Sequence, residues 1–443
     1  MKKTTLALGL CLALATTASA QKQGGISATV LQQIEKSQGS TAKDKALFNA
    51  MASNKIDNFA KNFSNRNTFD THFSVETAKQ SIHDQKSSGR CWMFSSFNVF
   101  RSDFARQHAD SLTVEFSHDY LFFYDQLEKA NLMLQGVIDN AKKPMDDVRV
   151  QFFFKSPLND GGTFCGAADL APKYGLVPKS VQPETFSAEN TSKISSLISS
   201  KLREYGLELR KMVADGKKAQ AISARKTEML STVYRMLAMT MGEPVKFYNE
   251  TVGRQLAGTF IMVMNDPRRP YHKTYEVEYD RHVYDGTNWK YLNLPMEDIA
   301  KLAIASLKDG KKMYSSYDVG KQYDRELGYL DTENYDYASL FSTTFPMDKA
   351  DRIATYDSGS THAMTLSAVD LDKNGNPIKW KVENSWGPNN GVQGCLVMSN
   401  RWFNEYMFRL VVDKKYVPEN LQKEFDQKPV MVMPEDPLFG LDD

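Results

Sequence analysis

An apolar stripe that begins directly after a cysteine restricts the fold of this chain more than any other segment. The stripe follows Cys91 and consists of Met93, Phe97, Phe100 and Phe104. Intervals of four, three and four residues place these side chains on one face of a helix, which must be buried. Gly89 interrupts the helical pattern just before, so the helix is predicted to begin near Cys91.

The position of Cys91 in a first helical turn predicts a reactive thiol. Backbone N–H groups there have no partner within the helix, and the positive end of the helix dipole favours a thiolate, which is the nucleophilic form. Gln85 precedes Cys91 by six residues, so its amide can return over the helix start. With the Cys91 N–H it would form a pair of donors for the oxyanion of a tetrahedral intermediate. An ordinary buried cysteine is the alternative.

A candidate base lies far along the chain. His362 opens an apolar run, a turn follows at residues 372–376, and residues 378–382 alternate between apolar and polar. The pattern predicts a hairpin that brings His362 close to Asn384, whose carbonyl can orient the imidazole without adding a charge. A purely structural histidine is the alternative for His362. The other histidines carry no comparable signal: His72, His83, His108, His118, His272 and His282.

The first twenty residues predict a secretory signal peptide. Lys2 and Lys3 precede an apolar run over residues 6–15, and Ala18-Ser19-Ala20 supplies small residues for cleavage before Gln21. A buried N-terminal helix is the alternative. We expect a secreted or periplasmic protein whose mature chain has no membrane span, because no other stretch approaches about 18 unbroken apolar residues.

Charge and composition exclude several function classes. Lysine and arginine total 55 against 54 acids, which gives no overall attraction to nucleic acid, so no nucleic-acid partner is expected. Hydrophobic residues make up 41% of the chain, as in a globular protein with a large core. The sequence has no zinc-type Cys/His spacing. A thiol nucleophile with a histidine base needs neither a metal nor an organic cofactor, so none is expected.

Cysteine usage does not predict a disulfide scaffold. Removal of residues 1–20 leaves Cys91, Cys165 and Cys395, an odd number that requires at least one thiol to remain unpaired within the chain. Cys165 and Cys395 are expected to be buried free thiols, and a disulfide between them is the alternative.

The order of these motifs resembles the papain superfamily. Gln85-x5-Cys91-Trp92, then His362, then Asn384-Ser385-Trp386-Gly387 is closest to the branch of bleomycin hydrolase and the bacterial aminopeptidase C. Further ordered segments resemble that branch: residues 117–131 (SHDYLFFYDQLEKAN), 159–162 (NDGG), 173–180 (KYGLVPKS), 318–321 (DVGK) and 361–364 (THAM).

The resemblance implies roles for individual residues. Gln85, Cys91, His362 and Asn384 take the four catalytic places of the family. Gly161 and Gly162 match the glycines whose backbone pairs with bound peptide, and a plain turn is the alternative for them.

The distance between nucleophile and base indicates an insertion. His362 lies 362 − 91 = 271 residues after Cys91, whereas papain-like enzymes have roughly 130 to 150 residues between the two. Amphipathic patterns at residues 194–212 and 229–241 predict a helical hairpin that accounts for much of the difference. The resemblance implies that this insertion assembles the enzyme into a homo-oligomer, namely a hexameric ring.

We therefore expect an α+β papain-like fold made of a helical half and a β-rich half, with a helical insertion and a C-terminal arm. The predicted division is 1–20 signal peptide, 21–69 N-terminal extension, 70–186 helical half, 187–311 insertion, 312–412 β-rich half and 413–443 arm.

The expected activity is that of an exported cysteine aminopeptidase that hydrolyses peptide substrates through a thioester on Cys91. In the resembling family the terminal carboxylate of the arm lies near the substrate's amino group, and Asp443 is the candidate for that contact. A solvated, disordered end is the alternative for Asp443. The double aspartate at the end of this chain departs from the family's ending, and the export signal departs from its usual intracellular location. An endopeptidase with an open cleft and an inactive peptide-binding protein are the alternatives.

Overall fold

The computed structural model describes residues 24–38, 41–108, 114–246 and 260–439. They belong to two compact units, which divide between Ala60 and Lys61. The first unit contains the helices α1 (Ala28–Ser37), α2 (Ala42–Met51) and α3 (Asp57–Ala60). Residues 1–20, for which a signal peptide is predicted, and Asp443 lie outside the described residues.

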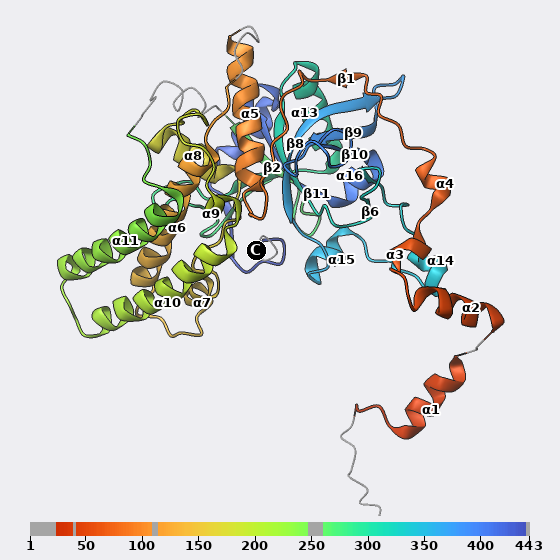
Figure 1. The fold of residues 1–443 in the computed structure, drawn as a ribbon, viewed down its shortest axis with the longest axis horizontal. Helices are drawn as coiled ribbons and strands as arrows, with labels where there is room; N and C mark the ends of the chain where they lie inside the picture. Colours follow the sequence, from red (N-terminus) through yellow and green to blue (C-terminus); the bar gives the residue numbers. More distant parts are fainter. Residues whose placement is uncertain (1–23, 39–40, 109–113, 247–259, 440–443) are drawn as a thin grey trace, which may run out of the picture. The chain divides into compact units, whose positions relative to one another are not determined.

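Helices dominate the first half of the second unit, as Figure 1 shows. They are α4 (Phe63–Arg66), α5 (Cys91–Gln107), α6 (His118–Asp139), α7 (Val148–Lys155), α8 (Phe164–Tyr174) and α9 (Phe186–Glu189). Helix α5 begins at Cys91 and packs against α8 and the strand β8 (His362–Leu371). Met93, Phe97 and Phe100 of its apolar stripe are almost completely buried, which confirms the predicted core helix.

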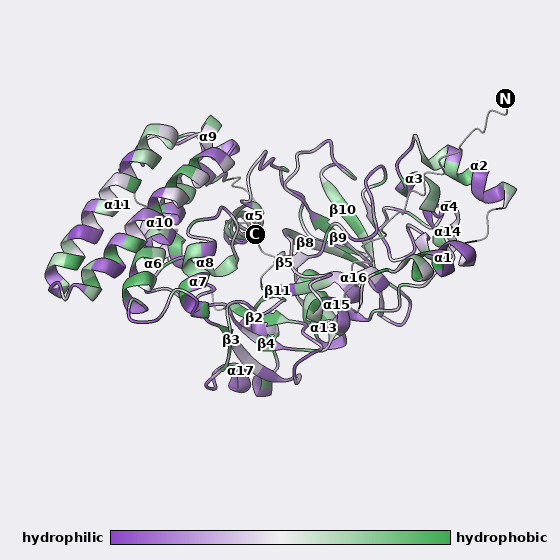
Figure 2. Cartoon of the chain, turned by 90° about the horizontal axis from the view of Figure 1, so that it is seen from below, coloured by the Kyte–Doolittle hydropathy of each residue, from purple (hydrophilic) through white to green (hydrophobic). Residues whose placement is uncertain are grey.

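A long helical hairpin follows these helices in the chain. Helices α10 (Ser192–Ala214) and α11 (Ala219–Met241) pack against each other and against α6 (Figure 1). Figure 2 shows hydrophilic and hydrophobic residues alternating along both helices, as the sequence pattern predicts. Glycines stand where the backbone adopts a positive φ, with +69° at Gly216 in the turn and +81° at Gly242 after α11.

A mixed sheet forms the remainder of the unit. Its strands include β1 (Val75–Glu76), β2 (Phe260–Met264), β3 (Lys273–Val277), β4 (Lys290–Asn293), β5 (Met313–Tyr317), β6 (Tyr323–Asp324), β7 (Tyr329–Leu330), β8, β9 (Pro377–Glu383), β10 (Cys395–Ser399), β11 (Met407–Asp413) and β12 (Val430–Val432). Among the described residues their order is β12-β3-β4-β2-β11-β5-β8-β9-β10-β7-β6, and β1 pairs with β8. Among the described residues the remaining helices are α13 (Met296–Lys308), α14 (Tyr337–Phe341), α15 (Lys349–Ala354), α16 (Asn400–Tyr406), the 3-10 helix η1 (Lys414–Tyr416) and α17 (Glu419–Phe425).

The hairpin of β8 and β9 positions the candidate base. The two strands pair antiparallel with Thr365 opposite Glu383, so His362 at the start of β8 lies near Asn384 just after β9. Strand β8 also pairs with β5, which places Tyr317 opposite His362. The predicted hairpin is therefore confirmed, and it is held in the middle of the sheet.

Strand β11 lies inside the sheet, and the chain beyond it runs to one edge of the sheet, where β12 pairs parallel with β3. The predicted boundaries at residues 186, 311 and 412 stay a prediction. None of the helices in the described residues is both long enough and apolar enough to cross a membrane.

Candidate active site

Cys91 is the first residue of α5, and its surroundings are those of an uncapped helix start. The preceding residue, Arg90, gives no side-chain cap in the described structure, so the positive helix end faces the thiol. Cys91 is half-buried, whereas its neighbour Trp92 has no exposed surface. The thiol lies 3.9 Å from the carbonyl oxygen of Gly89, and the N–H of Ala363 donates to Sγ at 3.5 Å. The candidate nucleophile therefore contacts the residue that follows the candidate base.

The imidazole of His362 is fixed by Asn384. Nε2 of His362 lies 2.8 Å from Oδ1 of Asn384, and the backbone N–H of Ser385 donates to the same oxygen at 2.8 Å. Because a backbone N–H can only donate, the Asn384 atom facing it is the carbonyl oxygen. Nε2 must then carry the imidazole proton, which leaves Nδ1 as the basic nitrogen of neutral His362.

Burial controls the protonation of this ring. His362 is 7% exposed, and its ring stacks on Trp386 with centroids 4.7 Å apart. Burial lowers the pKa of His362 to about 4, and the hydrogen bond with Asn384 opposes the shift only in part. The imidazole is therefore a neutral acceptor at physiological pH when the neighbouring thiol is also neutral.

Gln85 connects the two parts of the site. Its backbone N–H donates to the Ser385 carbonyl at 2.8 Å, and its Oε1 accepts from the Ser385 hydroxyl at 2.5 Å. Its Nε2 donates to the carbonyl of Ser88. An amide nitrogen carries two hydrogens, so the second can serve an oxyanion in the pocket that Gln85 shares with Cys91.

One pocket brings the predicted residues together. It is lined by Gln85, Gly89, Cys91, Asp160, Gly161, Gly162, Tyr314, Ser316, Ser360, Thr361, His362, Ala363 and Arg409. A second cavity shares Gly161 and Gly162 with the first, so the glycine pair lines both. Asn384 supports His362 from outside the lining, and Asp443 lies outside the described residues.

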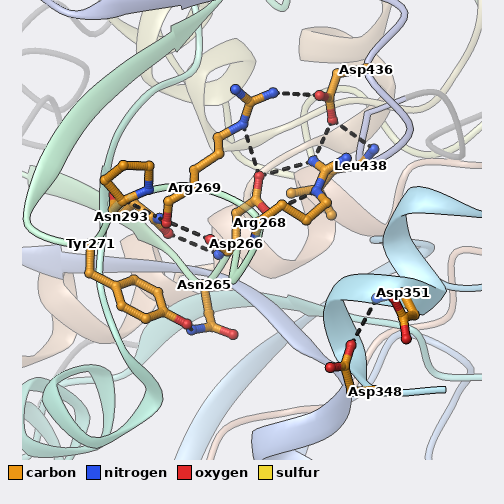
Figure 3. A network of polar contacts seen from close by, with 11 residues as sticks. Asn265, Asp266, Arg268, Arg269, Tyr271, Asn293, Asp348, Asp351, Asp436 and Leu438 are labelled. Atoms are coloured by element: carbon orange, nitrogen blue, oxygen red, sulfur yellow. Dashed lines mark hydrogen bonds and ion pairs between the residues drawn. The ribbon is translucent and has the colours of Figure 1, made fainter. Parts of the chain in front are cut away.

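The C-terminal arm reaches the second cavity, which Pro434 and Phe439 help to line. Asp436 fastens the arm (Figure 3): it accepts from Arg268 at 2.6 Å and from Arg269 at 2.5 Å. Both guanidinium groups also donate to Asp266, at 2.9 to 3.0 Å. We call these four residues the arm clamp.

The arm clamp keeps its outer carboxylate ionised. Burial raises the pKa of Asp436, but the hydrogen bonds from Arg268 and the Leu438 N–H, together with the arginine charges, outweigh burial, so the net shift is downward. Leu438 beyond the clamp has no exposed surface and Phe439 is also buried. The described end of the arm is therefore part of the core.

Several residues of the site carry no recognisable sequence signal. Arg409 lines the pocket from β11, with its guanidinium 5.5 Å from the ring centre of Phe439. His282 lies against Gly162 and Gly166, although its sequence neighbourhood is polar and uninformative. The cluster around His282 does leave one sign in the sequence. Asp125 and Lys129 are a charged pair one helical turn apart within a largely apolar helix.

The other two cysteines differ chemically from Cys91. Cys165 and Cys395 carry free thiols, as expected, although Cys395 is only partly buried. Burial raises the pKa of Cys165 well above the usual range and that of Cys395 to about 11. Neither thiol is therefore a nucleophile at neutral pH. The described residues contain no cluster of three or more His, Cys, Asp or Glu side chains suited to a metal ion.

Known proteins match this sequence over nearly the whole chain. The Peptidase C1-like family matches residues 25–249 and 243–439. Aminopeptidase C of Lactobacillus delbrueckii subsp. lactis is 37% identical over 423 residues, which cover 89% of this chain and 93% of that protein. Bleomycin hydrolase of Homo sapiens is 35% identical over 391 residues, covering 81% and 86% of the two chains.

A solved structure agrees with these relatives. The crystal structure of PepW from Lactobacillus rhamnosis HN001 superposes with a TM-score of 0.88 at 36% identity, and the match covers 94% of this chain and 99% of that one. The predicted α+β papain-like fold and the resemblance to the bleomycin hydrolase and aminopeptidase C branch are confirmed. The chain therefore belongs to the Peptidase C1-like family and is a cysteine-type peptidase.

Proposed function

We propose that the chain is an exported cysteine aminopeptidase that removes N-terminal residues from peptides through a thioester on Cys91. One observation carries the chemistry: Nε2 of His362 contacts Oδ1 of Asn384, which leaves Nδ1 as the basic nitrogen, and the thiol of Cys91 contacts Ala363, the residue next to that base. A nucleophile and a base that line one pocket, with an orienting group behind the base, are the arrangement that activated-nucleophile catalysis requires.

Acylation follows from this geometry. The Cys91 sulfur attacks the scissile carbonyl carbon, and Nδ1 of His362 takes the thiol proton. The oxyanion that forms is stabilised by the N–H of Cys91 and the amide of Gln85. His362 then gives the proton to the leaving amine as the C–N bond breaks, which leaves a thioester.

Deacylation reverses the proton transfers. Nδ1 of His362 takes a proton from a water molecule, and the hydroxide adds to the thioester carbonyl. The C–S bond breaks, the acid product leaves, and the proton returns to the Cys91 sulfur. The hydrogen bond between His362 and Asn384 keeps the ring in one orientation throughout, so both half-reactions use the same nitrogen.

The arm supports aminopeptidase action. Phe439 and Pro434 contribute to a cavity that adjoins the catalytic pocket at Gly161 and Gly162, where a longer substrate chain would otherwise extend. Relatives that are 35 to 39% identical bear the names aminopeptidase C, aminopeptidase G and aminopeptidase E. We infer that the arm limits this side of the cleft, so that only a short N-terminal stretch of substrate fits there.

Export and assembly complete the proposal. The charged, apolar and small-residue regions of residues 1–20 support secretion or export to the periplasm. The helical hairpin of α10 and α11 exposes apolar side chains, among them Leu197, Leu207 and Met239, as a surface for assembly into a hexamer would.

A paired-substrate assay tests the specificity. An aminoacyl fluorophore with a free amine should be hydrolysed, and the same compound with an acetylated amine should not. Deletion of residues 440–443 should reduce the difference in hydrolysis rate between the free-amine and the acetylated compound. A longer deletion would remove the buried side chains of Leu438 and Phe439, so a change in specificity could not be distinguished from a loss of stability. If the full-length enzyme cleaves acetylated peptides efficiently and the deletion changes nothing, the endopeptidase alternative is correct.

A further inference from the structure

A buried charged cluster lies directly behind the glycine pair. Asp125 and Lys129 project from α6, and His282 comes from the loop between β3 and β4. Oδ1 of Asp125 lies 2.5 Å from Nδ1 of His282, and Oδ2 lies 3.1 Å from Nζ of Lys129. Asp125 is fully buried, and Lys129 is 9% exposed. We call these three residues the glycine-loop cluster.

The ring of His282 fits a slot that two glycines create. A Cβ atom on Gly162 would lie 2.1 Å from the ring, and one on Gly166 would lie 2.4 Å from it. The ring also packs edge-on against Trp92, with centroids 4.5 Å apart. Any side chain at either glycine would displace His282, so this contact, rather than a turn, requires glycine at position 162.

The hydrogen bonds fix the charge state of the cluster. The backbone N–H of Thr163 donates to Nε2 of His282 at 3.2 Å, so Nε2 must present a lone pair and Nδ1 must carry the proton. Burial and the charge of Lys129 lower the pKa of His282, which agrees with a neutral ring. Burial raises the pKa of Asp125, but Lys129 and His282 outweigh it, so the carboxylate is ionised and is paired with the ammonium of Lys129.

The cluster holds one side of the loop 159–163. Nζ of Lys129 donates to the Gly161 carbonyl at 2.5 Å and to the Asn159 carbonyl at 3.2 Å. Gln126 holds the Asn159 carbonyl as well, at 2.9 Å, and the indole of Trp92 holds that of Asp160 at 2.9 Å. Within the described part of the chain, neither the N–H nor the carbonyl of Gly162 is hydrogen-bonded.

We propose that Asp125, Lys129 and His282 are positioning residues for substrate binding: they tether the inner side of the loop 159–163 so that the peptide groups of Gly162 face the bound substrate backbone. The proposal rests on the proposed peptidase function and specifies how its cleft is held in shape. Because the loop is already ordered, the free energy of substrate binding is not reduced by the entropy of ordering it.

Stability alone does not account for such a cluster. Burying three ionisable groups costs desolvation energy, and a buried ion pair is often no more stabilising than apolar residues of the same volume. Here Lys129 and His282 both hold backbone groups of the loop, and the loop lines both cavities.

Two alkylating probes of Cys91 separate positioning from folding. Leucyl chloromethyl ketone must bind as a substrate does, whereas iodoacetamide only needs access to the thiol. The ratio of their second-order rate constants should fall about tenfold in Lys129→Met, the effect of losing one charge-assisted hydrogen bond. Lys226→Met is the matched control. Lys226 donates to Asn131 and Gln135 of α6, and these residues line neither of the two cavities, so this variant should leave the ratio unchanged.

The outcomes are separable. A ratio in Lys129→Met equal to that of the control overturns the positioning role, and so does an equal fall of both rate constants, which would indicate general damage. A wild-type enzyme without preference for the leucyl probe overturns the proposed function together with this inference. If Lys129→Met does not fold, Gln126→Met carries the same test on the Asn159 carbonyl, with an expected fall of about threefold.

Discussion

Two opposed influences act on the pair of Cys91 and His362. The uncapped start of α5 favours the thiolate, and a thiolate would in turn favour a protonated imidazole. Burial of His362 acts in the other direction and favours the neutral pair. Such neighbours titrate in steps that belong to the pair, so no single step describes Cys91 or His362 alone.

Cys91→Ala separates catalysis from structure. Because the nucleophile is lost, kcat should fall by about 10⁴-fold or more. The side chain is only half-buried and opens onto the pocket, so the midpoint of thermal unfolding should change by less than about 3 °C. Steady-state assays and thermal denaturation measure the two effects. A large loss of stability would instead identify Cys91 as a structural cysteine.

Replacement of the orienting group should be milder than replacement of the base. Asn384→Ala frees the ring of His362 without removing it, so kcat should fall by about 10- to 100-fold, as is typical of residues that orient a functional side chain. His362→Ala removes the proton carrier and should approach the loss in Cys91→Ala. Equal losses in the two variants would show that Asn384 has a role beyond orientation.

The lowered pKa of His362 predicts a pH-dependent stability. Between pH 6.5 and about 4 the unfolded chain gains a proton on this residue and the folded chain does not, so the free energy of unfolding should decrease as pH falls. Over this window the contribution amounts to about 3 kcal/mol.

Urea denaturation in a Cys91→Ala background isolates this contribution, because no thiolate can then stabilise the imidazolium. His362→Asn in the same background removes the titrating group, and its unfolding free energy should depend less steeply on pH. Parallel pH profiles for the two proteins would contradict the assigned burial effect.

At the scale of secondary structure, local patterns were predictable and distant pairings were not. The hairpin of β8 and β9 and the helices α10 and α11 each have their pattern and their turn within one continuous segment. The parallel pairing of β2 with β4 and of β12 with β3 joins short strands whose sequences contain no information about their partners.

The same limit applies to the site. Cys91, His362 and Asn384 are embedded in local motifs, whereas His282 reaches Asp125 across 157 positions of the sequence. Its role depends on the slot between Gly162 and Gly166, which exists only once the helices and the loop after β3 have packed.

The arm clamp offers a test at this scale. Asp436→Asn removes the charge that both arginines share, so the arm should dock less tightly and the rate on acetylated relative to free-amine substrate should rise by about tenfold. Glu208→Gln is the control, since it weakens an ion pair with Arg225 that is partly exposed and on the helical hairpin. An unchanged ratio in Asp436→Asn would mean that the clamp does not set the specificity.

For the whole molecule we expect a closed assembly. The family resemblance of the helical hairpin implies a hexamer, and closed rings are a common outcome of heterologous interfaces. Sedimentation of the mature protein at micromolar concentration should give a single species of six copies. A monomer under these conditions would contradict the prediction and would leave the exposed side chains of Leu207 and Met239 unexplained.

Time-resolved mass spectrometry of a decapeptide incubated with the enzyme tests the proposed activity most directly. A cysteine aminopeptidase should give a ladder of products that lose residues one at a time from the N-terminus, no cleavage of the acetylated peptide, and no products with Cys91→Ala. Internal fragments from the acetylated peptide, or products that persist in Cys91→Ala, would contradict a cysteine aminopeptidase.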